Sequence, residues 1–146
     1  MSLDPDFVQA AARMMASSAP QAAALGFQFV ETTKARGSLH VPWRADLVGD
    51  PDTDVIAGGV VTALLDHTCG MAVITAVGEP MSTATLDLRI DYMRPAAPRA
   101  GVTAEAHCYK LTRSIAFVRA EAWDADRADP IATAQAAFIL NRMAVP

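Results

Sequence analysis

Residues 55–77, VIAGGVVTALLDHTCGMAVITAV, form a long apolar stretch that decides the fold of the chain. The stretch opens with a glycine pair, Gly58 and Gly59, and ends before Gly78 and Pro80, residues that commonly terminate helices. No helix breaker interrupts it in between. We therefore predict one long, buried helix with Asp66 near its middle.

Asp66 is the first candidate for a functional role in this helix. A carboxylate is costly to bury unless it is paired, neutralised or used in chemistry. Two other interpretations remain open. The helix length would suit a membrane span, although a central Asp-His pair is costly in a bilayer and no basic flank follows. Alternatively, Asp66 merely accepts a hydrogen bond from a backbone amide or a hydroxyl group in the core.

Composition narrows the class of protein. With 146 residues, of which 52% are hydrophobic, the chain is long enough for one filled core, so we expect a single domain. The net charge of −4, without a basic stripe interleaved with aromatic residues, argues against a nucleic-acid partner. Cys69, Cys108 and the three histidines lack the close spacing of zinc or disulfide sites, so we expect no metal.

The N-terminus is predicted to be helical rather than a secretion signal. Asp4 and Pro5 form a typical N-cap and first-turn pair, and apolar residues then recur at helical spacing, with the helix ending before Pro20. The early acidic residues do not fit the basic start of a signal peptide. We therefore expect a cytoplasmic protein without a membrane partner.

Strand-like patterns lie on both sides of the central helix. Before it, residues 25–32 and 38–43 should form a hairpin, followed by a polar loop over residues 44–54. After it, the predicted strands cover residues 83–93, 101–111, 114–123 and 131–141. This order favours an α+β fold in which a curved antiparallel sheet wraps the helix. Because one sheet leaves its edges uncovered, we expect oligomerisation.

The strand over residues 83–93 alternates strictly between apolar and polar residues. The apolar set, predicted to pack on apolar material, is Leu86, Leu88, Ile90 and Tyr92. The polar set, predicted to share the other face, is Thr85, Asp87, Arg89 and Asp91. We expect the charged members of the polar set to form ion pairs across strands.

The glycine pair lies where a helix can bind an oxyanion. The first amide N–H groups of a helix have no intrahelical acceptor, and the helix dipole is positive there. Without a side chain, Gly58 would let a carbonyl oxygen approach its amide closely. The alternative is that the glycines serve only close packing. Gly58 and Asp66 are eight residues apart, roughly 12 Å along a helix, so joint action on one carbonyl requires Asp66 of a second subunit.

Three segments resemble the hotdog-fold thioesterases of the PaaI (phenylacetic-acid-degradation) type. They are LVGDPDTDVI (47–56), AGGVVTALLDHTCGMA (57–72) and STATLDLRIDYMRPA (82–96). The resemblance runs from about Leu25 to the end of the chain. It implies an antiparallel sheet of about five to six strands wrapped around one long central helix. We expect a single domain over residues 1–146, with residues 1–20 as an N-terminal helical extension.

The same resemblance implies hydrolysis of an acyl-coenzyme A thioester, with no metal and no cofactor beyond the coenzyme A of the substrate. By position, the amide of Gly58, next to Gly59, would donate to the thioester carbonyl oxygen. Asp66 of the neighbouring subunit would act as nucleophile or as general base on water. Thr85 falls where the family often has a Ser or Thr that orients the acid or the water. The resemblance also implies a homodimer or a homotetramer, the homotetramer being a dimer of dimers.

Two positions depart from the family pattern. Ala57 replaces the histidine that usually precedes the glycine pair, and Asp50 lies near a position where many members carry asparagine. Both are candidate substrate-binding residues. Lys110 and Arg113, at a predicted turn between two strands, are further candidates because they could meet the phosphates of coenzyme A, although a solvated turn explains them equally well.

Two neighbours of Asp66 on the helix are given structural roles. His67, at i+1, points about 100° around the helix from Asp66, so we expect a packed or interface histidine. Nothing nearby would make Cys69 a thiolate, so we expect a small, inert and buried side chain.

The predicted function is hydrolysis of an aryl- or fatty-acyl-CoA to the free acid and coenzyme A. The alternative is a non-catalytic acyl-CoA or acyl-carrier binding module of the same fold, because Ala57 removes a polar group close to the carbonyl. A hotdog dehydratase is disfavoured, since its catalytic histidine before the helix is absent here.

Overall fold

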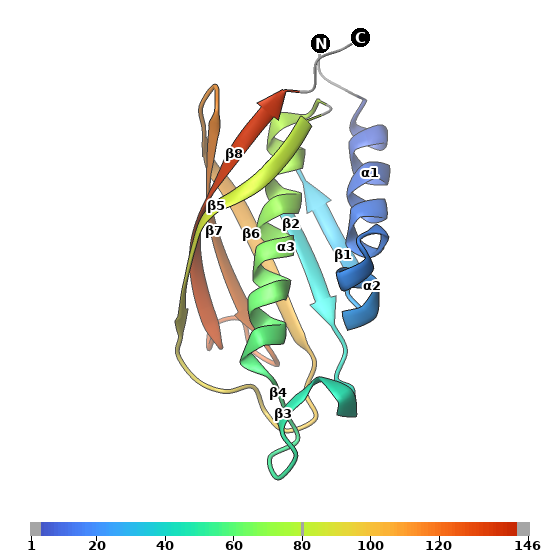
Figure 1. The fold of residues 1–146 in the computed structure, drawn as a ribbon, viewed down its shortest axis with the longest axis vertical. Coiled ribbons are helices and arrows are strands. Elements are labelled where there is room, and N and C mark those ends of the chain that lie inside the picture. Colours follow the sequence, from blue (N-terminus) through green and yellow to red (C-terminus); the bar gives the residue numbers. More distant parts are fainter. Residues whose placement is uncertain (1–3, 80, 143–146) are drawn as a thin grey trace.

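One helix at the centre of a curved sheet organises the fold. The computed structural model describes residues 4–79 and 81–142. Helix α3 (Gly58–Val77) lies against a six-stranded sheet (Figure 1). All pairs of neighbouring strands are antiparallel. The predicted α+β hotdog architecture and its long central helix are therefore confirmed.

The strands follow the predicted order with shifted ends. The sheet contains β1 (Gln28–Thr33), β2 (Arg36–Val41), β5 (Met81–Tyr92), β6 (Val102–Leu111), β7 (Ile115–Trp123) and β8 (Ala132–Arg142). Their order across the sheet is β1-β2-β6-β7-β8-β5. The predicted loop over residues 44–54 contains a 3₁₀ helix, η1 (Ala45–Leu47), and strand β3 (Val48–Asp50). Strand β3 pairs with β4 (Val55–Ile56), so the first residues of the apolar stretch form a small hairpin, and the helix begins at Gly58.

The N-terminal helical region is longer than predicted. Helix α1 (Pro5–Ser18) is capped by Asp4, whose carboxylate accepts a hydrogen bond from the Asp6 amide. A second helix, α2 (Pro20–Leu25), follows over residues for which the sequence predicted no element, and its last residue, Leu25, was predicted to begin a strand. Pro20 occupies its first turn, where a missing N–H is tolerated, and Gly26 ends it with a φ of 78°. The first strand therefore begins only at Gln28.

Small side chains on the concave face let α3 lie close to the sheet. Buried alanines dominate β6, β7 and β8, namely Ala104, Ala106, Ala116, Ala120, Ala122, Ala132, Ala134 and Ala136. Leu64, Leu65 and Met71 of α3 are fully buried. Of the helices in the described part of the chain, α3 alone is long and apolar enough to cross a membrane. Because 56% of its most apolar window is buried inside the structure, α3 serves here as the core helix.

A β-bulge in β5 shifts the alternation of this strand. Thr85 pairs with Phe138 of β8, and Asp87 pairs with the adjacent Ala137, so Leu86 is an extra residue on β5. No local pattern indicates this irregularity, because the apolar and polar residues alternate through it without interruption.

The bulge makes the predicted faces of β5 partly wrong. Thr85 does not share a face with the charged residues, because its hydroxyl contacts Asp66 of α3. Tyr92, on the other side of the bulge, also contacts α3. Leu86, predicted to pack with the apolar set, is instead 54% exposed.

The pairing of the charged residues on β5 was also predicted wrongly. Arg89 contacts Asp91 of its own strand, with 3.4 Å between Arg89 Nη2 and Asp91 Oδ1. Arg89 therefore pairs with a residue of its own strand, whereas the sequence predicted a partner on a neighbouring strand. Both side chains are largely exposed, so the pair contributes little to stability.

Strands β1 and β5 form the two edges of the sheet. β5 is 12 residues long, and Leu86, Tyr92 and Met93 expose large apolar side chains on it or directly after it. A long edge with exposed apolar groups is a typical place for pairing with another chain.

Candidate active site

The start of α3 presents two amides with free space around them. In the described part of the chain, the amides of Gly58 and Gly59 donate no hydrogen bond, and the N-cap residue Ala57 supplies no side-chain cap. A Cβ on Gly59 would meet no atom within 4 Å. A Cβ on Gly58 would make only an ordinary contact of 3.8 Å, with Tyr92 Cε1. Close packing within one chain therefore does not explain the glycine pair.

An apolar cavity of about 530 Å³ opens beside these amides. Its walls come from the β3–β4 hairpin, the start of α3, the end of β5 and the segment after β5. The apolar lining residues are Val55, Ile56, Val61, Met93, Pro95, Ala96 and Ile131. Ala57 and Gly58 also lie on the wall. The volume and lining are typical of a small-molecule site.

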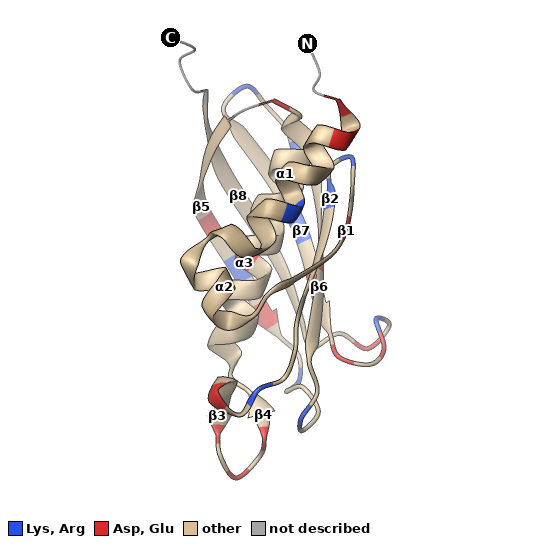
Figure 2. Ribbon diagram, turned by 90° about the vertical axis from the view of Figure 1, so that its right-hand side faces the viewer, with Lys and Arg blue, Asp and Glu red and all other residues tan. Residues whose placement is uncertain are grey.

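Asp50 lines the same cavity from an acidic hairpin. Figure 2 shows acidic residues gathered on the β3–β4 hairpin below α3. Asp50 Oδ1 accepts a hydrogen bond of 3.0 Å from the Asp52 amide, whereas Asp54 pairs with Arg99 at 2.9 Å. The Asp50 carboxylate thus supports its own turn and adds negative charge to the rim of the cavity.

Asp66 is held in place by Thr85. Thr85 Oγ1 donates a hydrogen bond of 2.8 Å to Asp66 Oδ1, which joins β5 to the middle of α3. Within residues 4–79 and 81–142, no cation pairs with Asp66 and no donor reaches its Oδ2. Asp66 is half-buried, so one oxygen of a restrained carboxylate is free to meet a ligand.

His67 and Cys69 do not act on this carboxylate. His67 Nε2 lies 2.8 Å from the carbonyl oxygen of Met15 in α1, and its ring centroid lies 6.0 Å from that of Phe27. His67 is thus a packed histidine, as predicted. Burial, followed by the nearby Asp66, raises the pKa of Cys69 to about 12, which confirms the inert thiol.

The predicted site residues lie in separate groups within one chain. Gly58 and Asp66 are separated by roughly 12 Å along the axis of α3. Lys110 and Arg113 lie at the β6–β7 turn, and β6 is three strands away from β5, the strand of Thr85. A single chain therefore brings together Thr85 and Asp66 in one group and Asp50, Ala57 and Gly58 in a second. It unites these two groups neither with each other nor with Lys110 and Arg113.

Tyr92 is a site residue that sequence reasoning missed. Its Oη donates a hydrogen bond of 2.9 Å to the carbonyl oxygen of Gly58 and contacts Thr62 Oγ1. The available signal was one hydroxyl in a strand face otherwise made of leucine and isoleucine, since such a hydroxyl usually finds a partner. Two residues further, Arg94 donates to both carboxylate oxygens of Asp124, at 2.7 and 3.1 Å. This pair anchors the end of β5 to the loop after β7.

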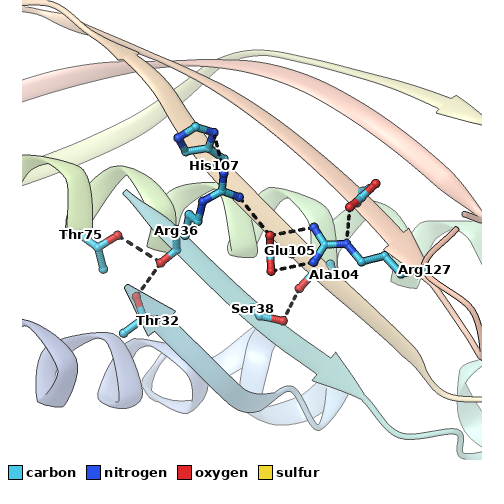
Figure 3. A network of polar contacts seen from close by, with 9 residues as sticks. Thr32, Arg36, Ser38, Thr75, Ala104, Glu105, His107 and Arg127 are labelled. Atoms are coloured by element: carbon cyan, nitrogen blue, oxygen red, sulfur yellow. Dashed lines mark hydrogen bonds and ion pairs between the residues drawn. The ribbon is translucent and has the colours of Figure 1, made fainter. Parts of the chain in front are cut away.

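A second hollow of about 530 Å³ lies on the outer face of the sheet, and each of its carboxylates pairs with an arginine. Glu105 of β6 accepts hydrogen bonds from Arg36 and Arg127, at 3.2 and 2.8 Å (Figure 3). These guanidinium groups, Arg127 foremost, hold the pKa of Glu105 below its usual range. Glu121 pairs with Arg127 as well. Because these carboxylates are already engaged, the hollow lacks an acid as free as Asp66.

The sequence of the chain is similar to those of known proteins. Residues 54–131, more than half of the chain, match the profile of the thioesterase superfamily. A protein of Halobacterium salinarum that is named as a candidate esterase is 28% identical over 94 residues, which are 62% of this chain. The match covers 61% of that relative, so the chain spans less than two thirds of its length.

Solved structures extend the likeness over most of the chain. A protein of Pseudomonas aeruginosa is 34% identical with a TM-score of 0.83, over 93% of this chain and 99% of its own. A mutant of the phenylacetic acid degradation protein PaaI of Thermus thermophilus is 27% identical with a TM-score of 0.70, over 82% and 97%. The PaaI protein of E. coli, 17% identical, shares the fold with a TM-score of 0.77 over 94% and 93%. Together with the family match, these relatives support thioesterase activity in general.

Proposed function

Because the chain belongs to the thioesterase superfamily and has the hotdog fold of its PaaI type, we propose that it is an acyl-CoA thioesterase. The proposed reaction is hydrolysis of an aryl- or fatty-acyl-CoA to the free acid and coenzyme A. The observation that carries the proposal is the state of Asp66, a half-buried carboxylate that Thr85 holds at one oxygen. A carboxylate that only filled the core would be expected to have its hydrogen-bonding groups satisfied.

The proposed chemistry uses the start of α3 and a carboxylate. The amides of Gly58 and Gly59 would donate hydrogen bonds to the thioester carbonyl oxygen and stabilise the negative charge that develops there. As a base, Asp66 would take a proton from water while the water oxygen bonds to the carbonyl carbon; the C–S bond then breaks, and the thiolate of coenzyme A leaves and is protonated. As a nucleophile, Asp66 would bond to the carbonyl carbon, the C–S bond would break and the thiolate of coenzyme A would leave and be protonated. Water would then hydrolyse the resulting anhydride to the free acid and regenerate Asp66.

The proposed active site lies between two subunits. The exposed edge of β5 supports pairing of two copies about a two-fold axis, because its apolar side chains would then be covered. Antiparallel α3 helices would set Asp66 of one subunit beside Gly58 of the other. We propose a cytoplasmic homodimer or dimer of dimers that needs no metal and no cofactor beyond the coenzyme A of its substrate.

The cavity beside Gly58 supports an apolar group of the substrate at this position. Its walls are mostly aliphatic, and its volume of about 530 Å³ leaves room for an aryl or a fatty acyl group. The acidic hairpin with Asp50 disfavours phosphates at the rim of this cavity. We therefore assign the phosphates of coenzyme A to a basic surface away from this hairpin, for which Lys110 and Arg113 are the candidates.

Release of free thiol from a panel of aryl and aliphatic acyl-CoAs tests the proposal. Wild type and Asp66→Asn are assayed together with the control Asp87→Asn, which replaces an exposed aspartate of β5. We expect Asp66→Asn to lose roughly 10²- to 10⁴-fold in activity, because it removes the base or nucleophile. Asp87→Asn should match wild type. Wild-type turnover in Asp66→Asn would contradict the assignment.

The alternative binding module is motivated by Ala57, which leaves the start of α3 without a polar side chain. Ala57→His restores such a group next to the oxyanion amides. A large gain in hydrolysis would identify an enzyme with a weakened site. Tight binding of acyl-CoA by both proteins, without turnover in either, would instead identify a binding module.

A further inference from the structure

We propose that Tyr92 positions the oxyanion amides at the start of α3, an inference that rests on the proposed thioesterase activity. Tyr92 Oη donates a hydrogen bond of 2.9 Å to the carbonyl oxygen of Gly58. Thr62 Oγ1 donates to the same oxygen at 3.1 Å, and the two hydroxyl groups contact each other. Side chains from β5 and α3 thus converge on one backbone oxygen.

The rigidity of the peptide unit carries this restraint to an amide. The carbonyl of Gly58 and the N–H of Gly59 belong to one planar peptide, so fixing the oxygen fixes the direction of the N–H. Hydrogen bonds to the oxygen also polarise the peptide and strengthen its N–H as a donor. Because glycine tolerates many backbone conformations and first-turn amides lack helical acceptors, this peptide needs support from outside the helix.

The surroundings of Tyr92 favour a positioning role over a packing role. Within one chain Tyr92 is 50% exposed, so it makes its contact with Gly58 at the surface of the subunit and not in its core. Its ring lines the same cavity as Gly58. The strand end that carries it is firmly held, because the Met93 amide donates to the Ile131 carbonyl at 2.8 Å and Arg94 binds Asp124.

Strand β5 thereby contacts both groups of the proposed reaction. Thr85 holds Asp66, and Tyr92 holds Gly58. If Asp66 acts in the site of the neighbouring subunit, each β5 supports one half of two different active sites. The tyrosine would act through Gly58 rather than by touching the substrate carbonyl.

Tyr92→Phe tests this role, with Tyr109→Phe as a matched control. Tyr109 is the other tyrosine of the chain and lies on β6, where Arg119 stacks on its ring at 4.2 Å. We expect Tyr92→Phe to lower kcat about tenfold, less than the loss of an oxyanion donor itself, with KM within about twofold of wild type. Its Tm and the kinetics of Tyr109→Phe should stay unchanged. An unchanged kcat, or a rise in KM alone, would overturn the proposal.

A second measurement does not depend on turnover. The amide signal of Gly59 in the free protein should shift in Tyr92→Phe and in Thr62→Val but not in Tyr109→Phe or Thr62→Ser. An unchanged Gly59 amide in Tyr92→Phe would overturn the positioning role. If that amide responds while wild type hydrolyses no acyl-CoA, the positioning role stands and the proposed thioesterase activity fails.

Discussion

Thr85 of β5 donates a hydrogen bond of 2.8 Å from its Oγ1 to Oδ1 of Asp66, the residue at the middle of the core helix. Because Leu86 is an extra residue on the strand, Thr85 faces the helix on the same side as Tyr92. The bond restrains the rotamer of Asp66 and leaves its second oxygen unengaged by the residues described. It is the contact on which the orientation of the proposed catalytic carboxylate depends.

Removing the Thr85 hydroxyl is expected to slow hydrolysis without unfolding the protein. A hydrogen bond to a charged group is worth about 1.5–3 kcal/mol, so Thr85→Ala should lower kcat by at least about tenfold. Thr85→Ser keeps the donor and should retain most of the activity. Steady-state kinetics on the best acyl-CoA of the panel provides the measurement. Equal losses in both variants would assign the effect to the missing methyl group, and so to packing.

A methyl group at Gly59 is expected to abolish hydrolysis while preserving stability. The added Cβ meets no atom of its own chain, and alanine reduces the entropy of the unfolded chain, so Tm should not fall. The same methyl group would obstruct a carbonyl oxygen approaching the amide. Gly70→Ala on the same helix is the control, because its Cβ would lie at an ordinary 3.7 Å from Phe138. Full activity in Gly59→Ala would remove this amide from the oxyanion site.

Mixed oligomers are expected to show that the active site is shared. Gly59→Ala and Asp66→Asn should each be nearly inactive alone. After free exchange at equal concentrations, about half of the dimers are mixed, each with one intact site, so about a quarter of wild-type activity should return. Mass spectrometry of the intact oligomers confirms the exchange. Activity that stays at the sum of the two variants would place Gly59 and Asp66 in one site within a single chain.

Acid is expected to destabilise the protein through Asp124. Arg94 foremost, with the amides of Ala97 and Ala125, holds the pKa of this carboxyl well below its ordinary value of 3.8. A lowered folded-state pKa stabilises the protein above the unfolded pKa, and this contribution is lost as the pH falls from about 5 toward the folded pKa.

Denaturation at pH 7 and at lower pH measures this contribution. Asp124 is 5% exposed, and its carboxylate binds Arg94 and two backbone amides, so Asp124→Asn should cost about 1.5–3 kcal/mol at pH 7. Arg94 keeps its pair with Asp129 in the variant. The variant should also show a weaker loss of stability in acid than wild type. Asp87→Asn serves as the exposed control and should change neither quantity. An identical pH profile in Asp124→Asn would show that other carboxylates dominate.

The core helix was predictable because local signals agree on it. Twenty residues from Gly58 to Val77 lack a breaker and end at a glycine in the left-handed conformation. The bulge at Leu86 was not predictable, because it arises from pairing with β8, a strand distant in sequence. Helix α2 was missed because a helix of six residues, which ends at Gly26, is too short to show a helical period.

The candidate site was predictable only in part. The lone acid in an apolar helix singled out Asp66, and the glycine pair singled out the amides at its start. The family resemblance implied that Thr85 orients either the acid or the water, and the structure shows its hydrogen bond to Asp66, whereas strict alternation had placed Thr85 on the opposite face. Tyr92 was counted as an apolar residue, since nothing local shows that its hydroxyl reaches Gly58.

The extra residue in β5 has a consequence for variation in chain length. A chain lacking Leu86 would regain a regular strand in which Thr85 and Tyr92 still face the helix, since the residues on both sides already keep that alternation. Such a deletion would remove the kink at the sheet edge and leave the internal contacts of both residues in place. Any change in subunit assembly or activity on shortening the strand here would therefore report on the edge of the sheet, on its shape and on the exposed Leu86 side chain, and not on these internal contacts.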